Sequence, residues 1–124
     1  MAKNYEQQGK VLSFMNDTGS DITSGSVVVM GAVLGIALAD IANGEPGNVQ
    51  IGGVFVVPKV SAADIKQGES LTWDISASAF DDNAAAAAAG DVTGPTAFAA
   101  QTAGAGATAL AVCFTGVPGV VANP

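Results

Sequence analysis

Short apolar segments separated by turn-forming residues run along the whole chain, and this pattern predicts β-strands. The clearest case is residues 48–57, where apolar side chains alternate with other residues on either side of Gly52 and Gly53. The phase of the alternation shifts at the two glycines, which indicates a bulge or a sharp bend in the strand. Pro58 ends the segment because proline cannot donate to a strand ladder.

Shorter segments of the same kind predict the other strands. Leu71, Trp73 and Ile75 alternate with other residues, so we expect all three to lie on one face and point inward. In total there are roughly seven or eight strands, spaced about 8–12 residues apart, which is typical of a small β-sandwich or barrel with short loops. Besides 48–57 and 70–75, the predicted strands are residues 10–14, 27–30, 34–38, 95–100 and 107–114.

Two segments allow short helical turns within this all-β fold. Residues 62–68 are compatible with a single helical turn that Gly68 would end. The run Ala84–Ala89 is compatible with a short helix capped by Asp82 or Asn83, or equally with a surface loop, because so short a helix is unstable alone. Both alternatives for the alanine run stay open from the sequence.

The length of 124 residues suits one domain. Residues 1–9 form a polar, extended N-terminal arm with one aromatic residue, residues 10–116 form the β domain, and residues 117–124 form a C-terminal tail. We expect little order in the tail unless a partner binds it. The start of the chain has no hydrophobic leader, and the longest apolar run, 27–39, is shorter than the roughly 20 residues of a membrane-spanning helix. We therefore expect no membrane partner.

Composition and charge narrow the function further. Valine and isoleucine outnumber leucine about four to one, which favours strands because β-branched side chains fit a pleated sheet. The formal net charge is −7, and the only basic residues are four lysines. Binding to nucleic acid depends on neutralising phosphates with lysine and arginine, so a nucleic-acid partner is not expected. An acidic surface is better suited to a basic protein surface.

The residues that usually carry catalysis or hold metals are scarce. The chain has no histidine, which excludes Ser–His–Asp and Cys–His arrangements. Its single cysteine, Cys113, lies in an apolar run and is expected to be a buried small hydrophobic residue. No phosphate-binding loop occurs. We expect no enzymatic activity, no cofactor and no metal. The best oxygen cluster is Asp81, Asp82, Asn83 and Asp91, whose spacing does not fit a calcium loop.

A set of motifs recurs in a fixed order along the chain and resembles a family of small tailed-phage proteins encoded near the major capsid gene. The family was formerly labelled uncharacterised or "predicted recombinase" and is now regarded as capsid decoration (cement) proteins. The resemblance covers nearly the whole chain to Gly116; the six-alanine run and the tail are additions to the usual pattern. The motifs are Met1–Tyr5, Ile22–Gly25, Gly35–Asp40, Gly53–Lys59, Gln67–Asp74 and Val112–Gly116.

The resemblance implies a virion structural protein that is made in the host cytoplasm and located on the outer surface of the capsid. Its partner would be the major capsid protein, and it would act as a homotrimer or a dimer. Lys3, Asn4 and Tyr5 of the arm are the predicted contacts, since an extended arm can add a strand to a sheet edge. The alternative is that Tyr5 packs on its own domain. Residues 53–59 and Trp73 are expected in the core.

Two other functions remain as alternatives. One is a recombination-associated, nucleotide-dependent phage factor, which the older family label suggests but the missing phosphate loop and basic patch disfavour. The other is a tail or adhesin module that binds carbohydrate.

Overall fold

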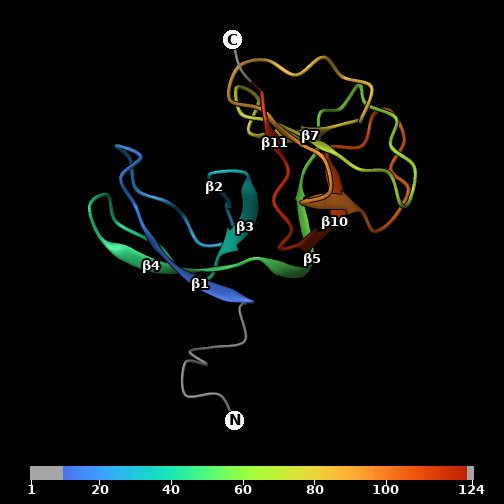
Figure 1. The fold of residues 1–124 in the computed structure, drawn as a ribbon. Coiled ribbons are helices and arrows are strands. Elements are labelled where there is room, and N and C mark those ends of the chain that lie inside the picture. Colours follow the sequence, from blue (N-terminus) through green and yellow to red (C-terminus); the bar gives the residue numbers. More distant parts are fainter. Residues whose placement is uncertain (1–9, 123–124) are drawn as a thin grey trace.

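The first of three antiparallel sheets has four strands in the order β1 (Val11–Met15), β4 (Pro46–Gln50), β3 (Val33–Ala37) and β2 (Val27–Met30). The computed structural model describes residues 10–122. The first sheet lies apart from the other two in Figure 1, with β1 and β2 at its opposite edges.

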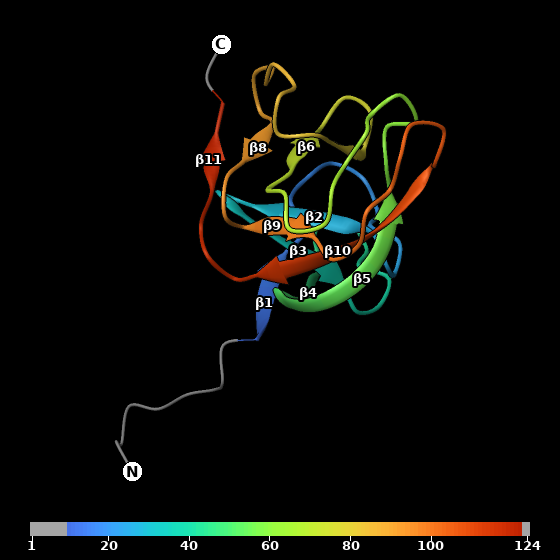
Figure 2. The same ribbon diagram turned by 90° about the vertical axis from the view of Figure 1, so that its right-hand side faces the viewer.

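The other two sheets are built from the rest of the chain (Figure 2). The second sheet has the order β5 (Gly52–Pro58), β10 (Ala109–Thr115) and β9 (Ala97–Ala99). The third has the order β11 (Val120–Val121), β8 (Val92–Thr93), β6 (Thr72–Asp74) and β7 (Ala79–Asp81). Residues 10–122 contain no helix, and the predicted all-β class is confirmed.

The bend predicted at the glycine pair is where the chain passes from the first sheet to the second. β4 ends at Gln50 and β5 begins at Gly52, so a single residue, Ile51, separates strands of different sheets. Gly53 has a φ of +114°, a backbone conformation that is costly for any residue with a side chain. The glycine therefore allows one apolar segment to supply strands to two layers.

The main core lies between the first sheet and the other two, as in a small sandwich. Leu34 and Ile36 from β3 pack there with apolar residues of β5, β6, β7 and β10. The rings of Trp73 and Phe80 meet edge-on at a centroid distance of 4.9 Å, and Phe80 lies 6.0 Å from Phe114. Aromatic contacts of this kind stabilise a core beyond simple area burial.

A smaller core covers the opposite face of the first sheet. It is formed around Val28, Ala37 and Val49 and is closed by Ile41, which pairs with Ile22 of the preceding loop. Both faces of this sheet are therefore buried over part of their area, which explains why β3 is apolar at nearly every position.

Two local expectations were wrong. Ile75 does not point inward with Leu71 and Trp73 but is 48% exposed, because β6 ends at Asp74 and the chain turns there. Residues 62–68 form turns, not a helical turn.

The alanine run is a loop, so the helix alternative is wrong. Asp82 accepts from the Ala84 N–H at 3.0 Å, as a helix cap would. Asp91, however, accepts from the Ala88 N–H at 2.9 Å, a donor that a helix would bond to the Ala84 carbonyl. Such local side-chain bonds compete with helix formation.

The described part of the tail is more ordered than expected. Val120 and Val121 of β11 pair with β8, and the Gly119 N–H donates to the Ala32 carbonyl at 2.8 Å. The third sheet therefore binds this segment without a partner.

Candidate docking surface

The predicted arm contacts Lys3, Asn4 and Tyr5 lie outside the described residues. Their contact role stays a prediction. The described residues do, however, contain a surface of the kind that binds proteins, on the second sheet.

The outward face of the second sheet is apolar. Along β5, Val57 points into the core, whereas Val54 and Val56 are 59% and 73% exposed. The ladder with β10 places Val54 opposite Cys113 and Val56 opposite Ala111. We call this surface the apolar face; its residues are Val54, Val56, Pro58, Phe98, Ala109, Ala111 and Cys113.

No residue of the apolar face carries a charge, although the chain as a whole is acidic. The exposed parts of Val54, Val56 and Phe98 alone amount to roughly 300 Å², which is near the size of the largest patch on a typical monomer. A continuous surface of this kind usually marks a protein–protein contact.

The edge of the second sheet adds backbone groups to the same surface. β5 is an outer strand, and the Lys59 N–H donates to the Thr108 carbonyl of the neighbouring β10 segment at 2.9 Å. This bond shows which residues of β5 direct their backbone groups toward β10 and which direct them away. The N–H and C=O groups of Val54 and Val56 point away from β10. They make no hydrogen bond to another residue within 10–122. A partner could therefore use both side chains and backbone.

These observations correct two expectations. Residues 53–59 were expected to be core, but Val54 and Val56 are among the most exposed apolar residues. Cys113 was expected to be buried, but it is only half-buried because it belongs to the outward face of β10. Trp73 is buried as expected, at 6% exposed.

The acidic residues do not gather into a binding site. Asp91 is buried and accepts from the N–H groups of Ile75 and Ala88, at 3.1 and 2.9 Å. Over residues 10–122, no three acidic or cysteine side chains are grouped so that they could hold a metal ion. Within the same range, no helix has the length and apolar character needed to cross a membrane.

Asp74 is the one residue in the described part of the chain whose carboxyl pKa is clearly shifted. The Ser76 hydroxyl donates to it at 2.7 Å, and the backbone N–H groups of Ala77 and Ser76 donate at 3.2 and 3.0 Å. These bonds lower the pKa of Asp74 below its ordinary value of 3.8, the hydroxyl contributing most. They shape a tight turn after β6.

Comparison with known proteins agrees with this structural character. The profile of a family described as phage cement protein matches residues 6–114. The chain belongs to the phage cement protein family. No curated protein and no solved structure matches it. The resemblance seen in the ordered motifs is thereby confirmed.

Membership assigns the cement protein a structural role in the virion, in association with the capsid. A structural family indicates a role other than catalysis. Sequence reasoning found the family but not the apolar face. The signal was the run of apolar residues on both faces of β5, which by itself does not distinguish a strand buried on both sides from one with an open face.

Proposed function

We propose that this cement protein binds the outer surface of the assembled phage head, in contact with the major capsid protein, and stabilises the shell. The observation that carries the proposal is the uncharged apolar face with the open edge of β5 beside it. The family supplies the association with the capsid, and the face supplies a surface suited to it.

Stabilisation follows from linkage. A ligand that binds only the assembled shell shifts the equilibrium toward that shell. Burying roughly 300 Å² of apolar surface contributes about 7 kcal/mol, part of which offsets the cost of association. Many copies on one head make modest affinity at each site sufficient.

We also propose that the protein is a homotrimer, with a dimer as the alternative, and that Lys3, Asn4 and Tyr5 contact a protein partner. A domain of this size with so many alanines gains stability from association. Measuring the molar mass of the free protein by light scattering over a range of concentrations distinguishes a monomer, a dimer and a trimer.

Sedimentation with capsids tests the main proposal. Purified protein is mixed with empty, expanded capsids and centrifuged, and the bound copies per capsid are counted. Saturation at a fixed stoichiometry supports the proposal, whereas absence of binding at micromolar concentration contradicts it. The temperature at which the capsids lose integrity should rise with bound protein.

A matched pair of variants assigns the binding to the apolar face. Val56→Asp places a carboxylate at the centre of the face, whereas Val120→Asp places one at a comparably exposed valine, 63% exposed, on β11. We expect Val56→Asp to lose at least tenfold in capsid affinity, because an unpaired charge would be buried on binding. Val120→Asp should bind like the wild type; equal loss in both variants would remove the role of the face.

A further inference from the structure

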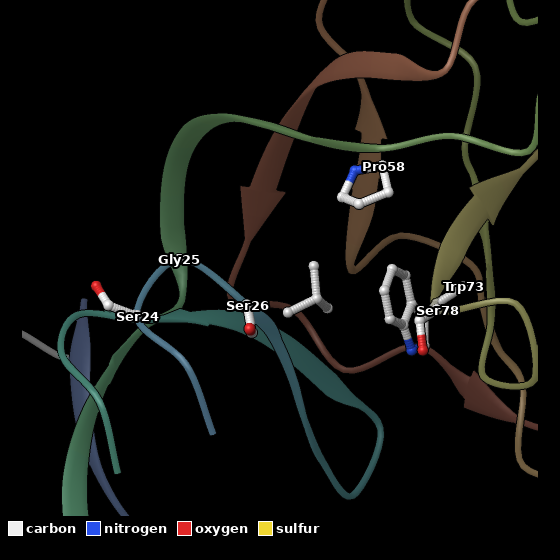
Figure 3. Close-up of a pocket in the computed structure, with 7 residues that line it drawn as sticks. Ser24, Gly25, Ser26, Pro58, Trp73 and Ser78 are labelled. Carbon is white, nitrogen blue, oxygen red and sulfur yellow. The ribbon is translucent and has the colours of Figure 1, made fainter. Parts of the chain in front are cut away.

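A groove separates β2 from the turn that follows β6 (Figure 3). It consists of two adjoining hollows of about 360 and 220 Å³, and Val27, Trp73 and Ser78 line both. Ser24 and Ser26 lie on one side, and Pro58 and Trp73 on the other. We call this the β2 groove. The β2 groove shares Pro58 with the apolar face, but Val54 and Val56, on which the function proposed above depends, do not line it.

One wall of the β2 groove is an open strand edge. β2 is an outer strand of the first sheet, and the Ala37 N–H donates to the Ser26 carbonyl at 3.0 Å. This bond shows which residues of β2 direct their backbone groups toward β3 and which direct them away. The N–H and C=O groups of Val27 and Val29 point away from β3. They have no hydrogen-bond partner within residues 10–122. Four unpaired backbone groups in a groove form a template for an extended chain.

The opposite wall offers a slot for a large side chain. Trp73 packs on Phe80 with one edge and lines the hollows with the other. Its indole N–H makes no hydrogen bond to a described residue, yet it is not sealed from the groove. Ser78 lines the same two hollows as Trp73. Trp73 and Pro58 therefore offer an apolar wall against which an aromatic side chain with a polar end can pack.

No residue that lines the groove carries a charge, so the groove suits an aromatic side chain and not a charged one. Residues 1–9 contain one aromatic residue, Tyr5.

The sheet order decides which copy supplies the segment. Residues 1–9 precede β1, at the edge opposite β2, so the chain's own arm must pass four strand spacings, roughly 19 Å, to lie beside β2. Nine extended residues span at most about 30 Å, which leaves about three residues to pair. That is too few to cover β2 and also seat Tyr5. An arm from another copy has no such limit.

We propose that residues 1–9 of a second copy pair with β2 as an added strand and seat Tyr5 against Trp73. The inference rests on the homo-oligomer proposed above and names the partner of Lys3, Asn4 and Tyr5. Exchange of arms would link the copies at the groove and leave Val54 and Val56 of the apolar face free for the capsid.

Cysteine pairing between full-length chains tests this arrangement. All chains carry Cys113→Ala, so that the natural thiol is removed. An Asn4→Cys chain, which keeps Tyr5, is mixed with a Ser26→Cys chain and oxidised gently, and the products are mapped by mass spectrometry. We expect a disulfide that joins positions 4 and 26 of different chains. Pairing Asn4→Cys with Gln101→Cys, an exposed position that does not line the groove, is the matched control and should yield little product.

A second variant tests the backbone pairing. Val29→Pro removes an N–H that points outward, and an edge strand tolerates proline at such a position. Because Val29 also packs against the core, Trp73 fluorescence is used to check that the variant is folded. The loss of one edge hydrogen bond should lower the cross-linking yield about fivefold. Trp73 is the only tryptophan, so its fluorescence reports both folding and access to the groove in every variant.

Several outcomes overturn the inference. A double variant that closes a disulfide within one chain would assign the groove to the chain's own arm. Equal products from positions 26 and 101 would indicate random collision. If the fluorescence of Trp73 shows that it is shielded from solvent only when capsids are added, the groove binds a capsid segment and not the arm. Capsid sedimentation by wild-type protein is measured separately, so failure of decoration and failure of arm exchange are told apart.

Discussion

The ammonium group of Lys59 donates a hydrogen bond to the carbonyl oxygen of Ala107, 3.1 Å away, in the buried region where β5 ends and β10 begins. The same Nζ donates to the carbonyl oxygens of Val60 and Ser61, at 2.8 and 3.3 Å. Over residues 10–122 the only ion pair joins Lys66 and Asp64, so Lys59 is held by carbonyl groups and not by a carboxylate. This contact fixes one end of the sheet that carries the apolar face.

Replacing Lys59 with methionine should destabilise the protein. The substitution keeps most of the side-chain volume but leaves the Ala107 carbonyl without its donor, at a cost of about 1–3 kcal/mol in the free energy of unfolding. The Val60 and Ser61 carbonyls lose one donor each but keep the backbone N–H groups of Ala63 and Gly106. Urea unfolding followed by Trp73 fluorescence measures the change. Lys66→Met is the control, because this exposed side chain should contribute less than about 1 kcal/mol. Equal effects would show that loss of charge, not loss of the three bonds, is responsible.

Thr96 should be essential to the contact between the first sheet and the second. Its fully buried hydroxyl accepts the Leu34 N–H of β3 at 3.1 Å. Thr96→Val has the same shape but cannot accept this bond, so we expect a loss of about 1–3 kcal/mol in the free energy of unfolding. Thr108→Val, at an exposed position, should be nearly neutral in the same urea titration. A stable Thr96→Val protein would mean that another acceptor reaches Leu34.

Gly119 should be intolerant of any side chain. A Cβ there would lie 2.1 Å from the carbonyl oxygen of Thr93, so the backbone joining β11 to β8 would have to move. We expect Gly119→Ala to release residues 117–122 and to speed amide hydrogen exchange at Ala122, whose N–H is bonded to Asp91. Gly104→Ala is the matched control, since its nearest contact is at 3.9 Å. Unchanged exchange at Ala122 in Gly119→Ala would contradict the expectation.

Asp74 gives stability a weak dependence on acid. Its pKa is lower in the folded protein than in the unfolded chain, so its contribution is present above the unfolded value and is lost as the pH falls through the folded value. Asp74→Asn should therefore be less stable than the wild type at about pH 6 and equal to it at about pH 2. The difference in urea midpoint will be small, because the carboxylate is exposed to water. A constant difference at both pH values would point to lost hydrogen bonds alone.

The strands that could be predicted lie in apolar or alternating segments bounded by turn-forming residues. Alternation located β4, β5 and β6, short apolar runs located β1, β2, β3, β9 and β10, and the glycine pair located the bend between the first two sheets. β7, β8 and β11 have only two or three residues each, too few for any period, and were not predicted. Their pairing depends on Trp73 and Phe80 and on neighbours distant in the chain. Local sequence does not contain that information.

The candidate sites were hidden for a related reason. Positions 54, 56 and 57 are all valine, yet only Val57 is buried, because the core lies on one side of β5. The β2 groove likewise depends on which strand is outermost in the first sheet, and sheet order is a tertiary property. The family, by contrast, could be recognised from ordered motifs without knowledge of either surface.

The pairing of β5 with β10 also affects how the protein reaches its folded state. Val56 and Ala111 face each other although about 55 residues separate them in the chain. Closing so long a loop costs entropy before any contact compensates, so we expect folding to take roughly milliseconds to seconds. Until β10 arrives, β5 exposes apolar side chains on both faces and unpaired groups on both edges, a state that aggregates readily. The yield of refolded protein should therefore fall as its concentration rises.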